Sequence, residues 1–279
     1  MQNFVYKTLP DSGLGDRLLD LINVYTYSEI LGYKNFYVEW KYGPQFDKSR
    51  KCLKLENLLK YICLPENIIF VTKQEINNIS NAFIFDYCVG ALSLYSFMDK
   101  YVEEKYKNVY EKKYYDICKT IKMKNLPQEV INIFDNNNIS TIHLRRTDKI
   151  SKNKLCFGID HCELNNLNNI TKSFINNELQ NNNKICIISD DENEKKNFIN
   201  EYKSTKIIFF NLDDQVLQTY VDYYCLMSSK NIFMSQQFST FSITASLFYK
   251  ITNLYYPYNY GKIQDDKFDK ILNFIYFII

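Results

Sequence analysis

The stretch KICIISDDENEKKNFINEYKSTKIIFFN, residues 184 to 211, decides the fold class of this chain. It opens with an apolar, β-rich run (184 to 190), continues with a helical pattern (192 to 202) and ends in a second apolar run (206 to 211). A strand, a helix and a strand in this order are typical of a βαβ unit with parallel strands. We therefore expect an α/β protein with parallel sheets.

The same alternation extends along most of the chain. The second half predicts four βα units, with strands at 140–146, 184–190, 206–211 and 231–235 and helices near 164–179, 192–202, 214–229 and 239–250. The first half predicts a helix at 18–32 ending at Gly32, strands at 35–40, 67–72 and 81–87, and a helical segment at 95–124. A helix and linker at 126–138 separate the halves, so we expect a domain boundary near residue 137.

The composition excludes several classes of protein. The chain of 279 residues has 46% hydrophobic residues, enough for one large domain or two ordinary ones. The net charge of +2, with Lys mixed among Asp and Glu, argues against a nucleic-acid or acidic-membrane surface. No window reaches the ~18 apolar residues of a membrane span. The eight Cys form no CxxC pair, which favours a reduced, cytoplasmic protein.

The stretch HLRRTDK, residues 143 to 149, concentrates rare residues. Lys and Arg together number 34, yet Arg occurs only at positions 17, 50, 145 and 146. The alternation of a strand would place His143 and Arg145 on one face and Leu144 and Arg146 on the other. A planar, permanently charged guanidinium suits a diphosphate in a way that lysine does not. The alternative is an exposed basic strand end.

GLGDRL, residues 13 to 18, precedes the first predicted helix. Gly13 and Gly15 would let backbone N–H groups approach a ligand oxygen, and the helix N-terminus would favour an anion. The segment lacks the third glycine of the dinucleotide fingerprint and the ending of a Walker loop. A simple turn into a helix is the alternative, although the rare Arg17 favours a functional role.

Two polar clusters follow predicted strands, where parallel sheets bind ligands. SDDE (189 to 192) could bind a metal through Asp190 and Asp191, but helix capping is at least as good an explanation. SQQFSTFS (235 to 242) offers hydroxyls for a base, ribose or phosphate, again with capping as the alternative.

Taken in order, these pieces resemble the fucosyltransferase superfamily of the α1,2-, α1,6- and protein O-fucosyltransferase type. HLRRTDK is similar to the family's HxRRxD signature and is closest to the α1,6 type. The family's N-terminal glycine motif is similar to GLGDRL, and its strand and acidic turn are similar to ISDDENEKKNF. The family's helix, strand and S-x-F-S segment are similar to DYYCLMSSKNIFMSQQFSTFSITASLF. The similarity covers most of residues 10 to 250.

The resemblance implies a GT-B enzyme with two Rossmann-like domains facing across a cleft. The domains would be an acceptor-side domain at 1–137, a nucleotide-sugar domain at 138–262 and a C-terminal helix at 263–279 that packs back on the core. Such an enzyme transfers fucose from GDP-fucose to a glycan or other hydroxyl acceptor with inversion, and uses neither a metal nor another cofactor. The chain would be a stripped catalytic core in the cytoplasm, or the host cytoplasm if it is viral.

The resemblance also implies roles for single residues. Arg145 would bind the donor β-phosphate, with Arg146 as its support or a second phosphate contact. The other donor-binding residues would be Gly13, Gly15, Asp16, Arg17, His143, Asp190, Asp191, Asp222, Ser239, Thr240 and Ser242.

One departure concerns the general base. The α1,6 type has a glutamate shortly after RRTDK, whereas this chain has Asn153. The base is therefore unassigned among the candidates Asp16, Asp148, Asp160 and Glu163. The alternatives are a transferase of another GDP-, UDP- or dTDP-sugar, a non-catalytic nucleotide-sugar binder that lost the base and, least favoured, a structural virion or scaffold protein. The sequence indicates neither the acceptor nor the oligomeric state.

Overall fold

The computed structural model describes residues 2–9, 12–42, 51–86, 94–135, 138–145, 161–235, 239–248 and 253–255, with the backbone alone for 161–167. The chain divides into two compact units, one formed by the described residues up to Asn125 and the other by those from Leu126 to Ser246 together with Asn253–Tyr255. Each unit is built on its own parallel sheet. Among the described residues, no helix is both long enough and apolar enough to cross a membrane.

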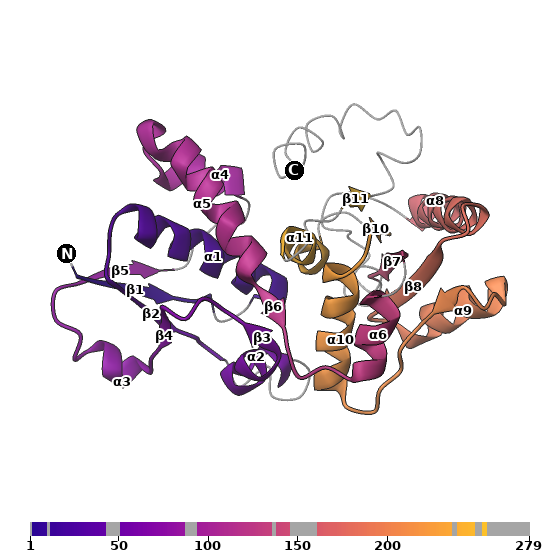
Figure 1. The fold of residues 1–279 in the computed structure, drawn as a ribbon, viewed down its shortest axis with the longest axis horizontal. Helices are drawn as coiled ribbons and strands as arrows, with labels where there is room; N and C mark the ends of the chain where they lie inside the picture. The colour runs from indigo at the N-terminus through magenta and orange to yellow at the C-terminus, as the bar shows by residue number, and fades with distance from the viewer. Residues whose placement is uncertain are drawn as a thin grey trace. The chain divides into compact units, whose positions relative to one another are not determined.

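The first unit has a four-stranded parallel sheet in the order β4-β2-β1-β5 (Figure 1). The strands are β1 (Asn3–Lys7), β2 (Asn35–Glu39), β4 (Ile68–Phe70) and β5 (Ala82–Asp86). The strands predicted at 35–40, 67–72 and 81–87 are therefore confirmed. The inner strand β1 was not predicted, because its three central residues are all buried and the run shows no alternation.

Helices of the first unit connect and cover this sheet. They are α1 (Leu14–Ile30), α2 (Leu55–Tyr61), α3 (Lys73–Ile76), α4 (Leu94–Tyr101) and α5 (Lys107–Thr120), with short 3-10 turns at Lys51–Leu53 and Glu104–Tyr106. The first helix ends before Gly32, as expected, and the φ of +75° at Gly32 favours glycine there.

The prediction of one helical segment at 95–124 was wrong in two places, because the helix is interrupted near its middle and a strand occupies its end. Two helices occupy this range, and Lys122–Met123 (β6) pairs antiparallel with Ile62–Cys63 (β3). The pairing depends on a segment about sixty residues away, and such tertiary pairing overrides a local helical pattern.

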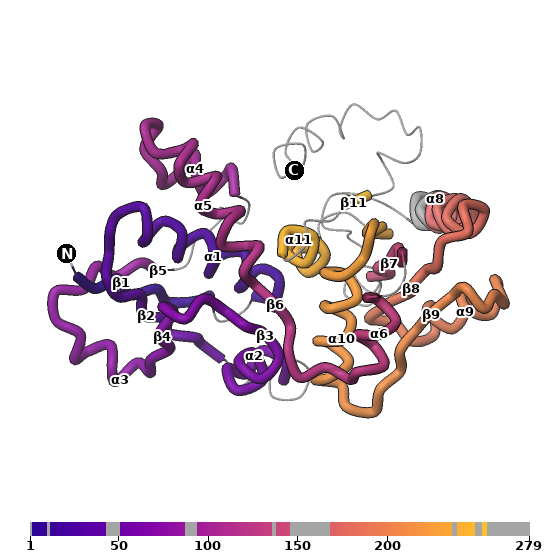
Figure 2. The backbone as a smooth tube through the Cα atoms, viewed as in Figure 1, coloured from indigo at the N-terminus to yellow at the C-terminus, as the bar shows by residue number. Residues whose placement is uncertain are grey.

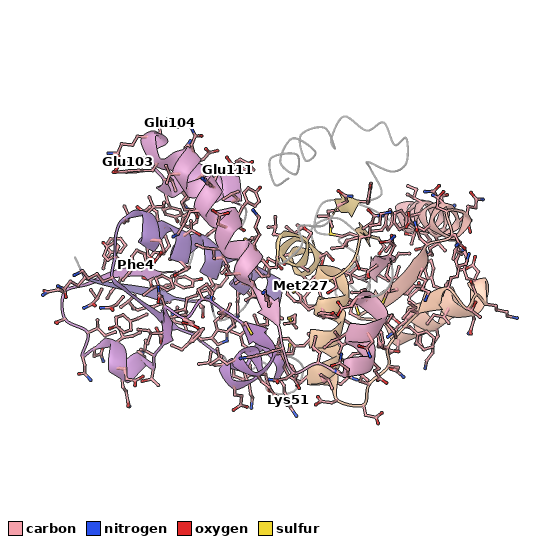
Figure 3. The ribbon with its side chains drawn as sticks, viewed as in Figure 1. Phe4, Lys51, Glu103, Glu104, Glu111 and Met227 are labelled. Carbon is pink, nitrogen blue, oxygen red and sulfur yellow. The ribbon has the colours of Figure 1, made fainter. Side chains whose placement is uncertain are left out.

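Aromatic side chains fill the core of the first unit. Phe4 on β1, labelled in Figure 3, is fully buried. Its ring contacts those of Tyr33, Phe36 and Phe83 at centroid distances of 5.0 to 5.6 Å. The Tyr110 hydroxyl of α5 donates to the Asn23 carbonyl of α1 at 2.8 Å. Core packing and one buried hydrogen bond therefore join the sheet, α1 and α5.

The second unit has a five-stranded parallel sheet in the order β11-β10-β7-β8-β9. Figures 1 and 2 show the course of the chain through this unit. Its elements are α6 (Gln128–Asp135), β7 (Ile139–Leu144), α8 (His161–Gln180), β8 (Lys184–Ser189), α9 (Glu192–Tyr202), β9 (Ile207–Ile208), α10 (Gln215–Met227), β10 (Asn231–Met234), α11 (Thr240–Leu247) and β11 (Asn253–Tyr255). All four predicted βα units are present. The strand order reverses between β7 and β10, and ligands of such sheets bind at the carboxyl ends beside this reversal.

The two faces of β7 contact different helices, as strand alternation requires. Ile142 and Leu144 belong to the same buried cluster as Phe174 of α8 and Phe198 of α9. On the opposite face, the Thr141 hydroxyl contacts the Cys225 carbonyl of α10 at 3.2 Å. His143 therefore faces α10 and α11.

Two predicted boundaries differ from the structure. The units divide at Asn125, not near 137, because α6 packs with the second unit through a Phe134–Tyr224 ring contact at 5.9 Å. The strand predicted at 206–211 is limited to Ile207–Ile208, because the backbone beyond it bonds to side chains. The helix predicted at 263–279 lies outside the described residues.

Phe4→Ala tests the aromatic core of the first unit. Removing a fully buried ring leaves a cavity and should lower the free energy of unfolding by about 3–5 kcal/mol. Denaturant unfolding measures the change, with Val109→Ala as control because Val109 is 57% exposed and should change stability by less than about 0.5 kcal/mol. Equal stabilities of the two variants would contradict this account of the core.

Candidate functional site

His143 lies at the carboxyl end of β7, beside the reversal of strand order. Its Nδ1 is 2.6 Å from the Ser242 hydroxyl and 3.4 Å from the Ser239 hydroxyl, both of which are buried. Phe241 packs against the imidazole at a centroid distance of 5.8 Å. Two motifs that are 99 residues apart in the chain thus meet at one place. Thr240, the first residue of α11, is partly exposed beside them.

The acidic turn after β8 is tied to the end of β7. Ser189 donates to the Leu144 carbonyl at 2.7 Å and accepts from the Asp191 N–H at 3.0 Å. Asp191 caps α9 by accepting from the N–H groups of Asn193 and Glu194, so the capping interpretation of this residue is confirmed. Asp190 is exposed.

Arg145 directly follows β7 and is partly exposed. The hydrogen bond from Ser189 holds the peptide just before it. Arg146, Asp148, Asn153 and Asp160 lie outside the described residues, as does the side chain of Glu163.

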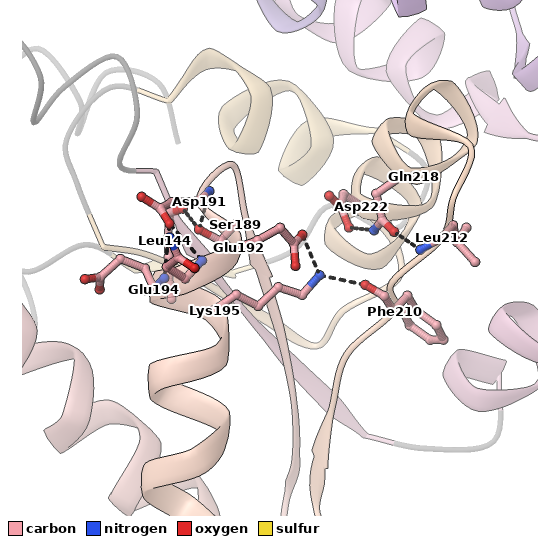
Figure 4. Close-up of polar contacts among 11 residues, drawn as sticks. Leu144, Ser189, Asp191, Glu192, Glu194, Lys195, Phe210, Leu212, Gln218 and Asp222 are labelled. Atoms are coloured by element: carbon pink, nitrogen blue, oxygen red, sulfur yellow. Dashed lines mark hydrogen bonds and ion pairs between the residues drawn. The ribbon is translucent and has the colours of Figure 1, made fainter.

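A second polar cluster surrounds Asp222 on α10 (Figure 4). Its Oδ1 accepts a 2.7 Å hydrogen bond from the Gln218 side chain, and Gln218 in turn accepts from the Leu212 N–H at 2.8 Å. Lys195 of α9 is only 2% exposed and donates to the Phe210 carbonyl at 2.6 Å. The sequence pointed to Asp222 but not to Gln218 or Lys195. A lysine on a charged helix is ordinarily exposed, and a glutamine is also mostly exposed, so neither burial was expected.

Burial raises the pKa of Asp222 to about 7. The Lys195 ammonium and the Gln218 hydrogen bond act in the opposite direction, since both favour the charged carboxylate. The residue as a whole has intermediate solvent exposure. Asp222 is therefore a carboxyl group whose charge changes near neutral pH.

The glycine segment belongs to the first unit. Gly13 precedes α1, and its N–H donates to the Asp16 carboxylate at 3.2 Å. Its φ is −73°, and a Cβ placed on it would meet no atom closer than 3.6 Å, so neither backbone conformation nor packing requires glycine there. Gly15 is buried in the first turn of α1.

Arg17 is 1% exposed, and its guanidinium bonds within the first unit. Nε donates to the Ser12 carbonyl at 3.2 Å and Nη1 donates to the Lys41 carbonyl, while the group lies over Trp40 at 5.2 Å. These contacts hold the segments after β1 and β2 together. They give Arg17 a structural role. The rarity of arginine in the sequence could not tell such a role from ligand binding.

Comparison with solved structures finds fucosyltransferases. The α-1,6-fucosyltransferase NodZ soaked with GDP-fucose matches with a TM-score of 0.52 and 10% identity, over 89% of this chain and 93% of that chain. The fucosyltransferase NodZ from Bradyrhizobium matches with a TM-score of 0.50 and 10% identity, over 88% and 91%. Apo POFUT1 matches with a TM-score of 0.54 and 10% identity, over 91% and 97%. No protein-family model and no curated protein sequence matches.

The chain therefore has the fold of these fucosyltransferases, with two α/β units on parallel sheets. This confirms the GT-B fold class that the sequence motifs predicted. The similarity extends over about nine tenths of both chains, so it concerns both units.

Asp222→Asn should remove a pH-dependent loss of stability. The unfolded carboxyl ionises near its ordinary pKa of 3.8, whereas the folded one keeps its proton to about pH 7. As the pH rises through this interval the unfolded chain binds fewer protons than the folded one, so the free energy of unfolding falls. Neutral Asn avoids this fall, and the advantage of the variant should grow to about 1–3 kcal/mol.

Urea unfolding of both proteins at about pH 4 and about pH 8 measures the effect. A difference between variant and wild type that is the same at the two pH values would show that Asp222 titrates normally.

Proposed function

We propose that this chain is an inverting, metal-independent glycosyltransferase that transfers fucose from GDP-fucose to a hydroxyl group of a glycan or similar acceptor. The contact between His143 and Ser242 carries the proposal, because it unites the two motifs at the ligand-binding edge of the sheet. The shared fold supports it, since structures with that fold include NodZ soaked with GDP-fucose and POFUT1 in complex with GDP-fucose.

Arg145 is the residue we assign to the departing diphosphate. Transfer of a glycosyl group builds negative charge on the leaving phosphate and positive charge on the sugar. A guanidinium at the carboxyl end of β7 would stabilise the charge that grows in the transition state. Its place beside the held Leu144 peptide supports this assignment, and Arg146 is the second phosphate contact in the proposal.

In the proposal, the hydroxyl groups of Ser239 and Ser242 contact one side of the His143 ring, and the donor contacts the other. A short contact to Nδ1 selects the orientation of the ring, so that the other edge of the imidazole can face the nucleotide. Thr240, at the start of α11, would provide a further polar contact in this scheme. Asp190 and Asp191 support the site through the turn that Ser189 holds.

The reaction needs no resident cofactor in this proposal, because the nucleotide sugar is the substrate. The described residues contain no cluster of three or more His, Cys, Asp or Glu side chains that could hold a metal ion. We retain the cytoplasm as the expected location, which the free thiols of Cys118, Cys186 and Cys225 support.

Thermal unfolding with nucleotides tests the donor class. GDP at about 100 times its Kd should stabilise the protein by about 2.7 kcal/mol and raise Tm by several degrees, with or without a divalent ion. UDP, dTDP and ADP serve as controls and should shift Tm less. Stabilisation by UDP or dTDP alone would show that the donor is a UDP- or dTDP-sugar instead of GDP-fucose. No shift in Tm with any nucleotide would contradict the proposal.

Arg145→Ala should reduce transfer from GDP-fucose at least ~100-fold, because the leaving diphosphate loses its fixed charge. Arg145→Lys should recover part of the rate, since it restores charge without the planar fork. Lys230→Ala, at an exposed position beside β10, is the control and should retain activity. Turnover of Arg145→Ala near the wild-type rate would disprove the assigned role.

A further inference from the structure

The hydroxyl group of Ser189 joins two parts of the second unit that are 45 residues apart in the sequence. It donates to the Leu144 carbonyl at 2.7 Å and accepts from the Asp191 N–H at 3.0 Å (Figure 4). A hydroxyl can play both parts at once because it has one O–H and two lone pairs. Ser189 is 9% exposed, so one buried oxygen connects the end of β7 to the start of α9.

The contact stands where the backbone pairing of β7 and β8 ends. Leu144 and Ser189 are the last pair in the register, and each is the last residue of its strand. The Leu144 carbonyl belongs to the peptide that leads into Arg145. Because a peptide group is planar and rigid, a hydrogen bond to this carbonyl also fixes the N–H and the Cα of Arg145.

A second bond holds the same backbone from the other side of β7. The Ser235 N–H, directly after β10, donates to the His143 carbonyl at 3.0 Å. The two carbonyl groups that precede Arg145 are therefore fixed from opposite sides, one by a backbone N–H and one by the Ser189 hydroxyl. The side-chain bond is the one that a single substitution can remove.

The start of α9 gives the Ser189 hydroxyl a fixed partner. Asp191 is the N-cap residue of this helix, and its Oδ1 accepts from the Asn193 N–H at 2.9 Å and from the Glu194 N–H at 3.1 Å. A side-chain cap of this kind stabilises the first turn of a helix. The Asp191 N–H therefore keeps one position, and so does the hydroxyl that accepts from it.

We propose that Ser189 is a positioning residue that orients Arg145 toward the departing diphosphate, with the capped start of α9 as its support. This inference rests on the proposed function. A guanidinium donates two parallel hydrogen bonds to phosphate oxygens only when its plane is correctly oriented, so the direction in which its backbone leaves the strand matters. Asp191 acts in this scheme through the helix cap and does not touch the donor.

A double-mutant cycle separates this role from a general loss of stability. Ser189→Ala should lower kcat/KM for transfer from GDP-fucose about 10-fold, because a misdirected guanidinium stabilises the leaving group less well. The same change made in Arg145→Ala should lower kcat/KM less than about 2-fold further, because the group that Ser189 positions is gone. Ser189→Thr keeps the hydroxyl group and should retain most of the activity.

Ser228→Ala is the matched control for the loss of a buried hydroxyl. Ser228 is 8% exposed, and its hydroxyl has no hydrogen-bond partner among the described residues. This variant should transfer fucose like the wild type. If transfer by Arg145→Ala is too slow to measure, the Kd for GDP from calorimetry supplies the same cycle, because GDP keeps the β-phosphate that Arg145 is proposed to bind.

Two helix caps provide a second comparison. Asp214 caps α10 by accepting from two backbone N–H groups at 2.9 and 3.2 Å, much as Asp191 caps α9. Asp191→Ala and Asp214→Ala should each lower Tm by about 2–4 °C, but only Asp191→Ala should reduce kcat/KM. Asp191→Asn keeps the cap and should retain activity, whereas a carboxylate that binds the donor through its charge could not be replaced in this way.

Non-additive effects of Ser189→Ala and Arg145→Ala, together with a loss of rate in Asp191→Ala alone among the cap variants, would support the inference. Ser189→Ala with wild-type activity, or with the same loss in the presence and absence of Arg145, would overturn it and leave the proposed function intact. Wild-type protein that neither binds GDP nor transfers fucose would overturn both. Should Ser189→Ala fail to fold, equal rates for the two cap variants would overturn the inference.

Discussion

Strand β7 is buried along its whole length and is hydrogen-bonded to a parallel strand on each side. The strand order reverses at this element, so the connections on its two sides run to opposite faces of the sheet. Helix ends and polar turns therefore converge at its carboxyl end, where His143 and Arg145 are located. The positions of the polar groups at this edge follow from the pairing of one strand.

The hydrogen bonds around that edge connect distant parts of the second unit. Ser189 fixes the end of β7 to the turn after β8, and Ser242 fixes His143 to α11. A preorganised group of this kind need not be rearranged as charge develops during a reaction, which is why rigid scaffolds favour electrostatic catalysis. The proposed chemistry therefore draws on the same contacts that stabilise the sheet.

A different principle governs the cluster around Asp222. Burial opposes the charge on this carboxyl group, while Lys195 and Gln218 favour it, so the group titrates near neutrality. The same two side chains satisfy the backbone of Phe210 and Leu212, which explains why β9 ends after Ile208. The early end of β9 and the environment that sets the pKa of Asp222 thus depend on the same contacts.

Local patterns in the sequence were enough to predict the four βα units, the capping role open to Asp191 and the opposite faces of His143 and Leu144, because periodicity and strand alternation are properties of neighbouring residues. The sequence could not show that Arg17 donates hydrogen bonds to the Ser12 and Lys41 carbonyls or that Lys195 is buried. Nor could it show that His143 finds its partner in Ser242. These features were decided by tertiary structure, because each depends on which distant backbone groups and hydroxyls the packed strands and helices bring within hydrogen-bonding distance.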